Sequence, residues 1–157
     1  MKILPEVAEK FPRLAEQLII CTRRDENTRY WEDSVYSHLT VVEAAPDKVV
    51  WQFVVDESHC NQIGSWHGGC VATIIDICSS FALMVHEGKT QWKYLGVSTD
   101  LSVSYLRGVP SGTKARIECD VHRVGKSLAN LFVKIYDEEG NLCYTGTHSK
   151  YCLDPKL

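Results

Sequence analysis

A long apolar run, residues 68–85 (GGCVATIIDICSSFALMV), limits most strongly how this chain can fold. The run would make about five turns of helix, and its single charged residue is Asp76. A helix that is apolar on nearly all sides must be enclosed by other parts of the protein. Its length also suits a membrane span, but Asp76 and the amphipathic segments downstream favour a buried core helix. We therefore predict no membrane span.

Four segments after this run alternate between apolar and polar residues: 96–106, 113–124, 127–137 and 141–152. A period of two is typical of strands with one buried face, as at Ala115, Ile117 and Cys119. The breaks between the segments are too short for crossover helices, so we expect a meander of antiparallel neighbours. Upstream, residues 36–56 hold two β-rich runs around AAPDK, which predicts a hairpin.

The N-terminal residues 5–20 (PEVAEKFPRLAEQLII) predict helix, with Pro5 in the first turn and Pro12 starting or kinking a second piece. At 157 residues, the chain has the size of one ordinary domain. The economical architecture is an α+β hotdog fold, in which an antiparallel sheet of about six strands wraps around one long central helix. We assign residues 1–34 to an N-terminal helical extension and residues 35–153 to the hotdog domain.

Charge and cysteine usage narrow the functional classes. A formal net charge of -3 with no basic block argues against nucleic-acid binding and against adhesion to a membrane surface. The seven cysteines are scattered without a C-x-x-C pair, which indicates neither a zinc site nor a disulfide framework. The N-terminus resembles neither a signal peptide nor a transit peptide. These features favour a reducing, cytoplasmic location and leave the mitochondrion as the alternative.

The segment before the apolar run, NQIGSWHGG, places Gly68 and Gly69 at the start of the predicted helix. Amides in a first helical turn have no partners inside the helix, and glycine lets a ligand approach them closely. Such amides can bind an anion or a developing oxyanion. The alternative is that the two glycines only allow tight packing of the helix.

Asp76 lies eight residues after Gly68, or about 12 Å along a helix axis. This distance is too long for both residues of one chain to act on the same small group. If two central helices run antiparallel across a two-fold axis, each Asp76 comes near the Gly68 of the other chain. The alternative is a structural aspartate whose carboxylate is hydrogen-bonded nearby.

The spacing N-x-x-G-x-x-H-G-G-x-x-x-x-x-x-D, followed by GVSTDLSVSYL, closely resembles the hotdog-fold acyl-CoA thioesterases of the PaaI-like group. The motif is met here by Asn61, Gly64, His67, Gly68, Gly69 and Asp76. The resemblance covers about residues 50–150 in element order. It implies a homodimer, often paired into a homotetramer, that hydrolyses acyl-CoA without a metal or a redox cofactor.

The resemblance also implies roles for single residues. The Gly68 N–H would stabilise the thioester oxyanion, and the Asn61 side chain would help to polarise the carbonyl. Asp76 from the opposite subunit would act as general base on water or as nucleophile, while His67, with Gly69, would shape the turn. Ser98 would help to hold the water. Strict alternation places Ser98 on the sheet face opposite Leu101, and either a bulge or a site on the partner's side of the sheet would reconcile the two.

For the CoA moiety, the resemblance points to the end of one predicted strand and to the GKSLAN turn. The matching positions are Tyr105, Arg107, Lys126, Ser127 and Leu128. Arg107 and Lys126 could pair with phosphates. The alternative is that they are ordinary solvated charges.

Two other functions stay open at this point. A catalytically weak module that binds acyl-CoA or an acyl carrier would have the same fold. A hydratase would pair an aspartate with a histidine near the helix entrance, where His67 and Asp76 are not so placed. The remaining histidines that we considered are unclustered in the sequence, and we expect them to be surface or packing residues: His38, His59, His86 and His148. We interpret Cys70 and Cys78 as packing residues on the helix.

Overall fold

The computed structural model describes residues 1–23 and 27–155. Its elements follow one another as β1 (Lys2–Ile3), α1 (Pro5–Lys10), α2 (Pro12–Thr22), α3 (Asp33–Tyr36), β2 (Leu39–Ala45), β3 (Lys48–Val54), η1 (Glu57–His59), α4 (Gly68–Ala82), η2 (Leu83–Val85), β4 (Val97–Tyr105), β5 (Lys114–Val124), β6 (Leu128–Tyr136) and β7 (Leu142–Tyr151). The predicted central helix, the hairpin, the four later strands and the split at Pro12 are all present. The α+β hotdog prediction is confirmed.

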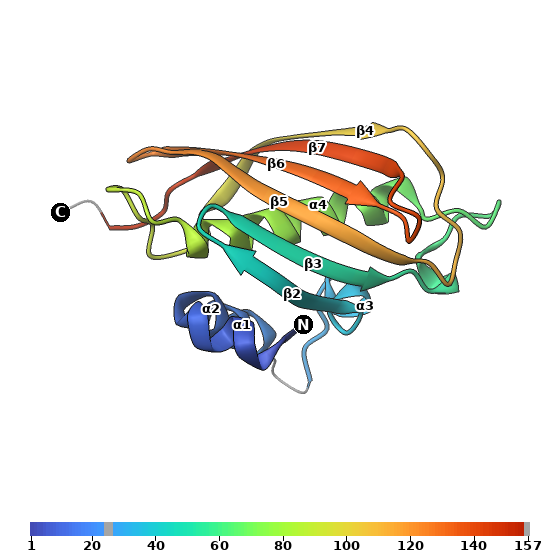
Figure 1. Ribbon diagram of the computed structural model, residues 1–157, viewed down its shortest axis with the longest axis horizontal. Coiled ribbons are helices and arrows are strands. Elements are labelled where there is room, and N and C mark those ends of the chain that lie inside the picture. Colours follow the sequence, from blue (N-terminus) through green and yellow to red (C-terminus); the bar gives the residue numbers. More distant parts are fainter. Residues whose placement is uncertain (24–26, 156–157) are drawn as a thin grey trace.

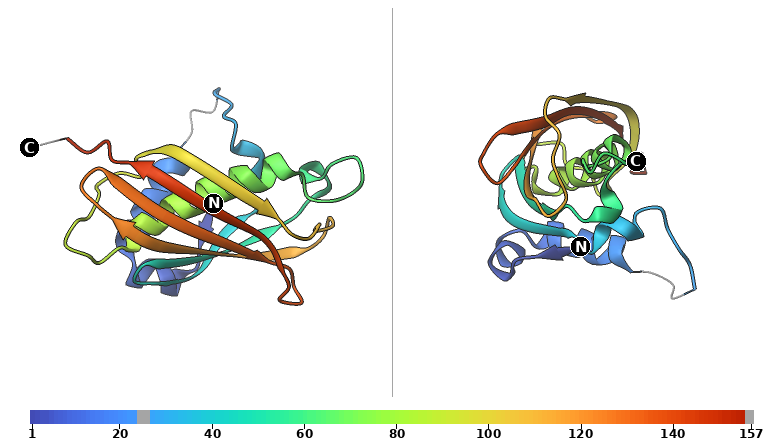
Figure 2. Two further views of the ribbon diagram at one scale, coloured as in Figure 1. Left: turned by 90° about the horizontal axis from the view of Figure 1, so that it is seen from above. Right: turned by 90° about the vertical axis from the view of Figure 1, so that its right-hand side faces the viewer.

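The described strands form one sheet with the order β1-β2-β3-β5-β6-β7-β4. The short β1 lies parallel to β2, and the other neighbours are antiparallel. The sheet curls around α4, as Figure 1 shows from the side and the right-hand view of Figure 2 shows nearly along the helix. The helix is therefore enclosed by the concave face of the sheet.

The core lies between α4 and this concave face. Inward residues of β5 and β6 alternate as predicted, since Ile117, Cys119 and Val133 are fully buried. The Trp51 ring of β3 packs edge-on against Phe81 of α4. The stretch Gly68–Val85 is long and apolar enough for a membrane span, but 61% of it is buried inside the protein. It is the core helix of this fold.

The meander prediction is wrong for β4, which pairs with β7 at one edge of the sheet and not with β5. Three strand spacings, about 14 Å, separate β4 from β5. The eight residues 106–113 can span up to about 26 Å in extended form, so a short loop reaches across without any helix. As an edge strand, β4 is exposed on both faces, and only Val103 of its residues is partly buried.

Gly96 shapes the entry into β4. Its φ is +67°, a conformation that residues with a side chain rarely adopt, and a Cβ there would collide with the carbonyl oxygen of Tyr151. The close approach allows β4 to start directly beside the end of β7, where Val97 pairs with Tyr151. Gly96 thereby sets the position of Ser98, two residues further on.

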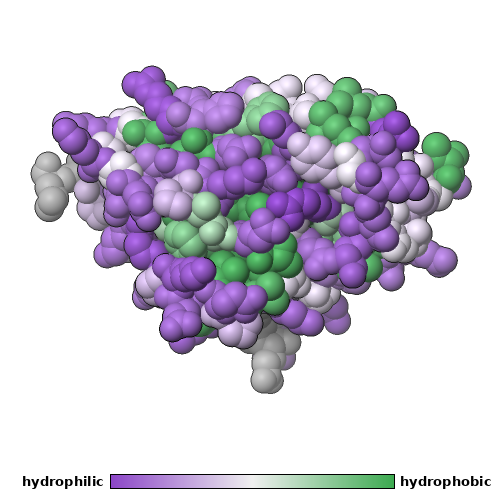
Figure 3. Space-filling view, in the orientation of Figure 1, coloured by the Kyte–Doolittle hydropathy of each residue, from purple (hydrophilic) through white to green (hydrophobic). Residues whose placement is uncertain are grey.

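The N-terminal helices join the same core, because Val7, Leu14 and Leu18 are buried within it. The Arg13 guanidinium donates hydrogen bonds to Gln91 Oε1 at 3.1 Å and to the Trp92 carbonyl oxygen at 2.8 Å. These bonds tie α2 to the segment that leads into β4. Figure 3 shows the molecule from the same side as Figure 1, with mostly hydrophilic residues and smaller hydrophobic patches between them.

Candidate active site

The loop before α4 is held by its own side chains. Asn61 Oδ1 accepts hydrogen bonds from the N–H groups of Ile63 (3.1 Å) and Ser65 (3.2 Å), which closes the turn. His67 is the N-cap residue of α4, and its Nδ1 accepts the Gly69 N–H at 2.9 Å. The Gly68 N–H donates no hydrogen bond within the described part of the chain. The Gly68 amide in the first turn of α4 is thus available to a ligand.

Tyr105, at the end of β4, covers the other side of Gly68. Its hydroxyl donates to the Gly68 carbonyl oxygen at 2.9 Å, and a Cβ on Gly68 would lie 3.2 Å from the Tyr105 ring. The absence of a side chain at Gly68 therefore keeps this entrance open. An open pocket of about 310 Å³ at this end is lined by residues that include Asn61, Gly68, Tyr105 and Arg107.

Within the described part of the chain, the sheet leaves one side of α4 partly uncovered. Asp76 lies on this side, together with Gly69 and Thr73. Its side chain is 45% exposed. The Ser98 hydroxyl donates to Asp76 Oδ1 at 2.7 Å. The register of β4 against β7 shifts between Ser98 and Asp100, which is a bulge that turns Ser98 toward the helix. The conflict with Leu101 in the sequence pattern is resolved by this bulge.

A second open pocket, of about 300 Å³, contains the Asp76 carboxylate. Its walls come from α4, from the start of β4 and from the N-terminal segment, with Lys150 of β7 among them. This pocket and the pocket at Gly68 have no lining residue in common. Within one chain, the candidate oxyanion amide and the candidate base thus face different openings.

His148 corrects the sequence interpretation, which treated it as a surface or packing residue. It is buried on β7, with Nε2 2.8 Å from Ser98 Oγ and 3.2 Å from Asp76 Oδ1. Its Nδ1 lies 2.7 Å from Ser79 Oγ of α4. A sequence signal was present, because His148 and Lys150 occupy consecutive core-facing positions of a strand where apolar residues are usual.

The protonation state of His148 follows from its burial. Its pKa is lowered to about 4: desolvation is the largest cause, the positive charge of Lys150 also lowers it, and the charges of Asp76 and Asp100 oppose both. The ring is therefore neutral at pH 7 and has one N–H. Since Ser98 donates its proton to Asp76, that N–H belongs at Nε2, where it faces Ser98 and Asp76. Nδ1 of His148 then accepts the hydroxyl proton of Ser79. The Ile75 carbonyl oxygen, 2.6 Å from Ser79 Oγ, competes for the same proton.

We expect His148 to make the fold sensitive to acid. The unfolded chain binds this proton near pH 6.5 and the folded chain only near pH 4, so the free energy of unfolding falls as the pH drops through this window. The full contribution is about 3 kcal/mol. Urea unfolding measures the free energy of unfolding at pH 7 and at pH 4.5. Between these two pH values, His148→Gln should lose less of this free energy than the wild-type protein. Equal losses in the two proteins would contradict this assignment.

The structure divides the five predicted CoA-binding residues into two groups. Tyr105 and Arg107 lie at the Gly68 end of the sheet, where Tyr105 pairs with Tyr144. Lys126, Ser127 and Leu128 form the turn between β5 and β6 at the other end, where Leu128 pairs with Tyr151. The second group is thus near the Ser98 end of β4, because Val97 also pairs with Tyr151.

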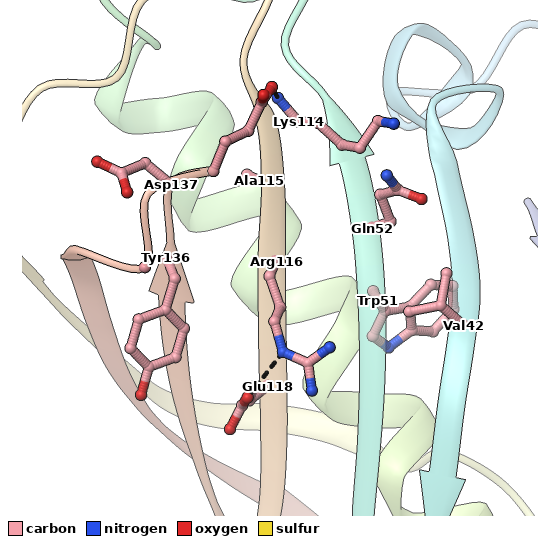
Figure 4. Close-up of a pocket in the computed structure, with 11 residues that line it drawn as sticks. Val42, Trp51, Gln52, Lys114, Ala115, Arg116, Glu118, Tyr136 and Asp137 are labelled. Carbon is pink, nitrogen blue, oxygen red and sulfur yellow. Dashed lines mark hydrogen bonds and ion pairs between the residues drawn. The ribbon is translucent and has the colours of Figure 1, made fainter.

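A wider pocket, of about 650 Å³, lies on the outer face of the sheet over β3, β5 and β6 (Figure 4). Its charged groups neutralise one another, since Arg116 donates to Glu43 at 2.7 Å and to Glu118 at 2.9 Å. The hydrogen bond from Lys48 is the main cause that holds the pKa of Glu118 below its usual value. Because Arg116 and Glu118 of this pocket hold each other, we place the candidate site around Asp76 and Gly68 instead.

Known proteins are similar to this chain in sequence and in structure. A family model described as "Thioesterase superfamily" matches residues 63–144. Acyl-coenzyme A thioesterase 13 of Mus musculus is 34% identical over 120 residues, which are 76% of this chain and 83% of the mouse chain. The crystal structure of zebra fish thioesterase superfamily member 2 is similar with a TM-score of 0.74 and 28% identity, over 93% of this chain and 97% of that chain. The E. coli PaaI protein shares the fold, with a TM-score of 0.69 and 13% identity over 94% and 99% of the two chains.

Proposed function

The chain belongs to the thioesterase superfamily, and from this premise we propose that it hydrolyses the thioester of an acyl-CoA to a free acid and CoA. The observation that carries the proposal is the Asp76 carboxylate, which is partly exposed on an otherwise buried helix and bound by the Ser98 hydroxyl. The name of the mouse relative supports CoA as the carrier of the acyl group. Seven free thiols suit a reducing compartment, so we propose the cytoplasm, with the mitochondrion as the alternative.

In the proposed reaction, Asp76 takes a proton from a water molecule that the Ser98 hydroxyl helps to orient. The water oxygen bonds to the thioester carbon, the C–S bond breaks, and the proton passes to the departing CoA thiolate. The Gly68 N–H stabilises the oxyanion, and the Asn61 amide group can donate to the same oxygen while its Oδ1 holds the loop. In the alternative, Asp76 attacks the thioester carbon directly, CoA leaves as the thiol, and water hydrolyses the resulting acyl-aspartyl anhydride; label from ¹⁸O-water in the Asp76 carboxylate after a single turnover would reveal this route.

We further propose that two subunits build each site. Within one chain, Gly68 and Asp76 are about 12 Å apart along the helix and open into separate pockets. The side of α4 that is left open holds Gly69, Thr73 and Asp76, of which Gly69 has no side chain to keep a second helix away. The exposed edge strand β4 could continue the sheet into a partner. A two-fold dimer, or a pair of such dimers, would cover both the open side of α4 and the edge of β4.

The CoA moiety would then be held by both groups of predicted binding residues. An antiparallel dimer brings the Tyr105 and Arg107 end of one subunit toward the Lys126–Leu128 end of the other. Arg107 and Lys126 would pair with the phosphates, and Ser127 and Leu128 would contact the nucleotide. The division of these residues within one chain supports this arrangement.

A panel of short, medium, long and aromatic acyl-CoAs, assayed for thiol release with the purified protein, tests the proposed hydrolysis. We expect at least one class to be cleaved with a kcat near 1 s⁻¹ or above, on the order of ordinary enzymes. Calorimetry with the same compounds measures binding separately. Binding without thiol release across the panel would favour the catalytically weak acyl-CoA or acyl-carrier binding module.

A further inference from the structure

Lys150 is a buried lysine without a carboxylate partner. It lies on β7 and is only 4% exposed. Its Nζ donates to Ser80 Oγ at 2.7 Å, and no carboxylate oxygen of the described residues lies within ion-pair distance. An ammonium group removed from water at this depth destabilises the fold by several kcal/mol unless its surroundings compensate. Its position therefore calls for an explanation beyond packing.

Three structural links connect Lys150 to Asp76. The Ser80 hydroxyl that accepts from Lys150 donates to the Asp76 carbonyl oxygen at 2.7 Å, so the lysine supports the turn of α4 that presents Asp76. Lys150 also lines the pocket that contains the Asp76 carboxylate. On the sheet it pairs with Ser98, the residue that donates to that carboxylate.

Lys150 is also electrostatically coupled to its neighbours. Burial lowers the pKa of its ammonium group and the charge of Asp76 opposes this, while Lys150 contributes to the low pKa of His148. The other titratable groups that face the pocket are Cys21, Glu32 and Tyr36 of the N-terminal segment, and Asp100 of β4 acts on His148. Among all these groups, Lys150 is the one that contributes a positive charge at neutral pH.

We propose that Lys150 is a positioning residue for Asp76: its bond to Ser80 fixes the helical turn between them, and its buried ammonium group acts on the cluster of Asp76, Ser98 and His148. The proposal rests on the proposed function only for its effect on catalytic rate. The electrostatic coupling is a property of the folded protein and can be measured without any substrate.

The expected sign is fixed by charge. A positive charge favours the deprotonated form of a neighbour, so its removal raises the pKa of His148, which contacts both Asp76 and Ser98. For charges roughly 10 Å apart and an effective dielectric constant of about 20, the shift should be about one pH unit. The acidic limb of the kcat/KM profile should therefore move to higher pH by about one unit in Lys150→Met.

The experiment compares Lys150→Met, Lys150→Arg and the matched control Lys134→Met, which removes a partly exposed lysine of β6 whose Nζ lies over the Phe132 ring. Lys150→Arg keeps the charge and should keep the acidic limb within about 0.3 pH units of wild type. Lys134→Met should leave it unchanged. An unmoved limb in an active Lys150→Met enzyme, or an equal shift in the control, would overturn the proposal.

Two NMR titrations test the coupling without catalysis. With ¹³C-labelled histidine, His148 should titrate near pH 4 in the wild-type protein and about one unit higher in Lys150→Met. With ¹³C-labelled lysine, the Lys150 signal should titrate below its ordinary value of 10.5, and lower still in Asp76→Asn. The second titration keeps the proposal falsifiable if Lys150→Met does not fold. Coupled titrations without thioesterase activity would reject the proposed function alone, and uncoupled titrations would reject the role of Lys150.

Discussion

Replacing Asp76 by Asn is expected to lower kcat about a thousand-fold, within the range found when a general base is removed. The amide has the shape of the carboxylate and still accepts the hydrogen bond from Ser98, but it cannot take a proton from water. Binding should be preserved, because the CoA contacts that we propose lie elsewhere on the sheet. A non-hydrolysable thioether analogue should bind to Asp76→Asn within about two-fold of its wild-type Kd, which calorimetry can measure.

The matched control is Asp120→Asn, on β5, whose carboxylate lies 3.9 Å from Lys48. A pair of this kind at the surface contributes about 0–1 kcal/mol, so both the stability and the kcat of this variant should stay near wild type. Near-normal turnover by Asp76→Asn would reject the mechanism and leave the fold assignment intact. Loss of analogue binding in Asp76→Asn would instead show that Asp76 contacts the substrate in the ground state.

The sequence pattern predicted the elements of this fold better than their arrangement. The long apolar run and the period of two are local signals, and they located α4 and the strands β4–β7 within one or two residues. The place of β4 at the sheet edge is a non-local property. A break of eight residues excludes a helix, but it does not decide whether the chain turns back at once or crosses three strand spacings first.

The candidate site shows the same division between local and non-local signals. Gly68 and Asp76 belong to one helix, so their spacing could be read from the sequence. His148 is brought to Asp76 by the pairing of β4 with β7 and the curl of the sheet over α4, which no local pattern encodes. Ser98 faces Asp76 because of a one-residue bulge, and alternation rules assume a regular register. His148 and Lys150 are polar residues at core-facing positions of a strand. This unusual pattern is the sequence signal that could have predicted their place beside Asp76.

Mixing two inactive variants should restore activity if each site is built by two subunits. Asp76→Asn lacks the base, and Gly68→Val places a branched side chain where the thioester oxygen must approach the amide, which we expect to lower kcat at least a hundred-fold. Gly68 is not in a left-handed conformation, and the added atoms would meet the Tyr105 ring 3.2 Å away, whose side chain can shift. The Gly68→Val fold should therefore survive, which circular dichroism can check.

In a mixed dimer, one site combines both intact residues and the other combines both altered ones. With free exchange at equal amounts, half of the dimers are mixed and each has one working site of two, so about a quarter of wild-type activity should return. The control is the double variant Asp76→Asn/Gly68→Val mixed with wild-type subunits, where each mixed dimer has one altered residue in each site and should be inactive. Because a site within a single chain could not be rebuilt by exchange, a mixture that stays inactive although mass spectrometry detects mixed dimers would show that each subunit works alone.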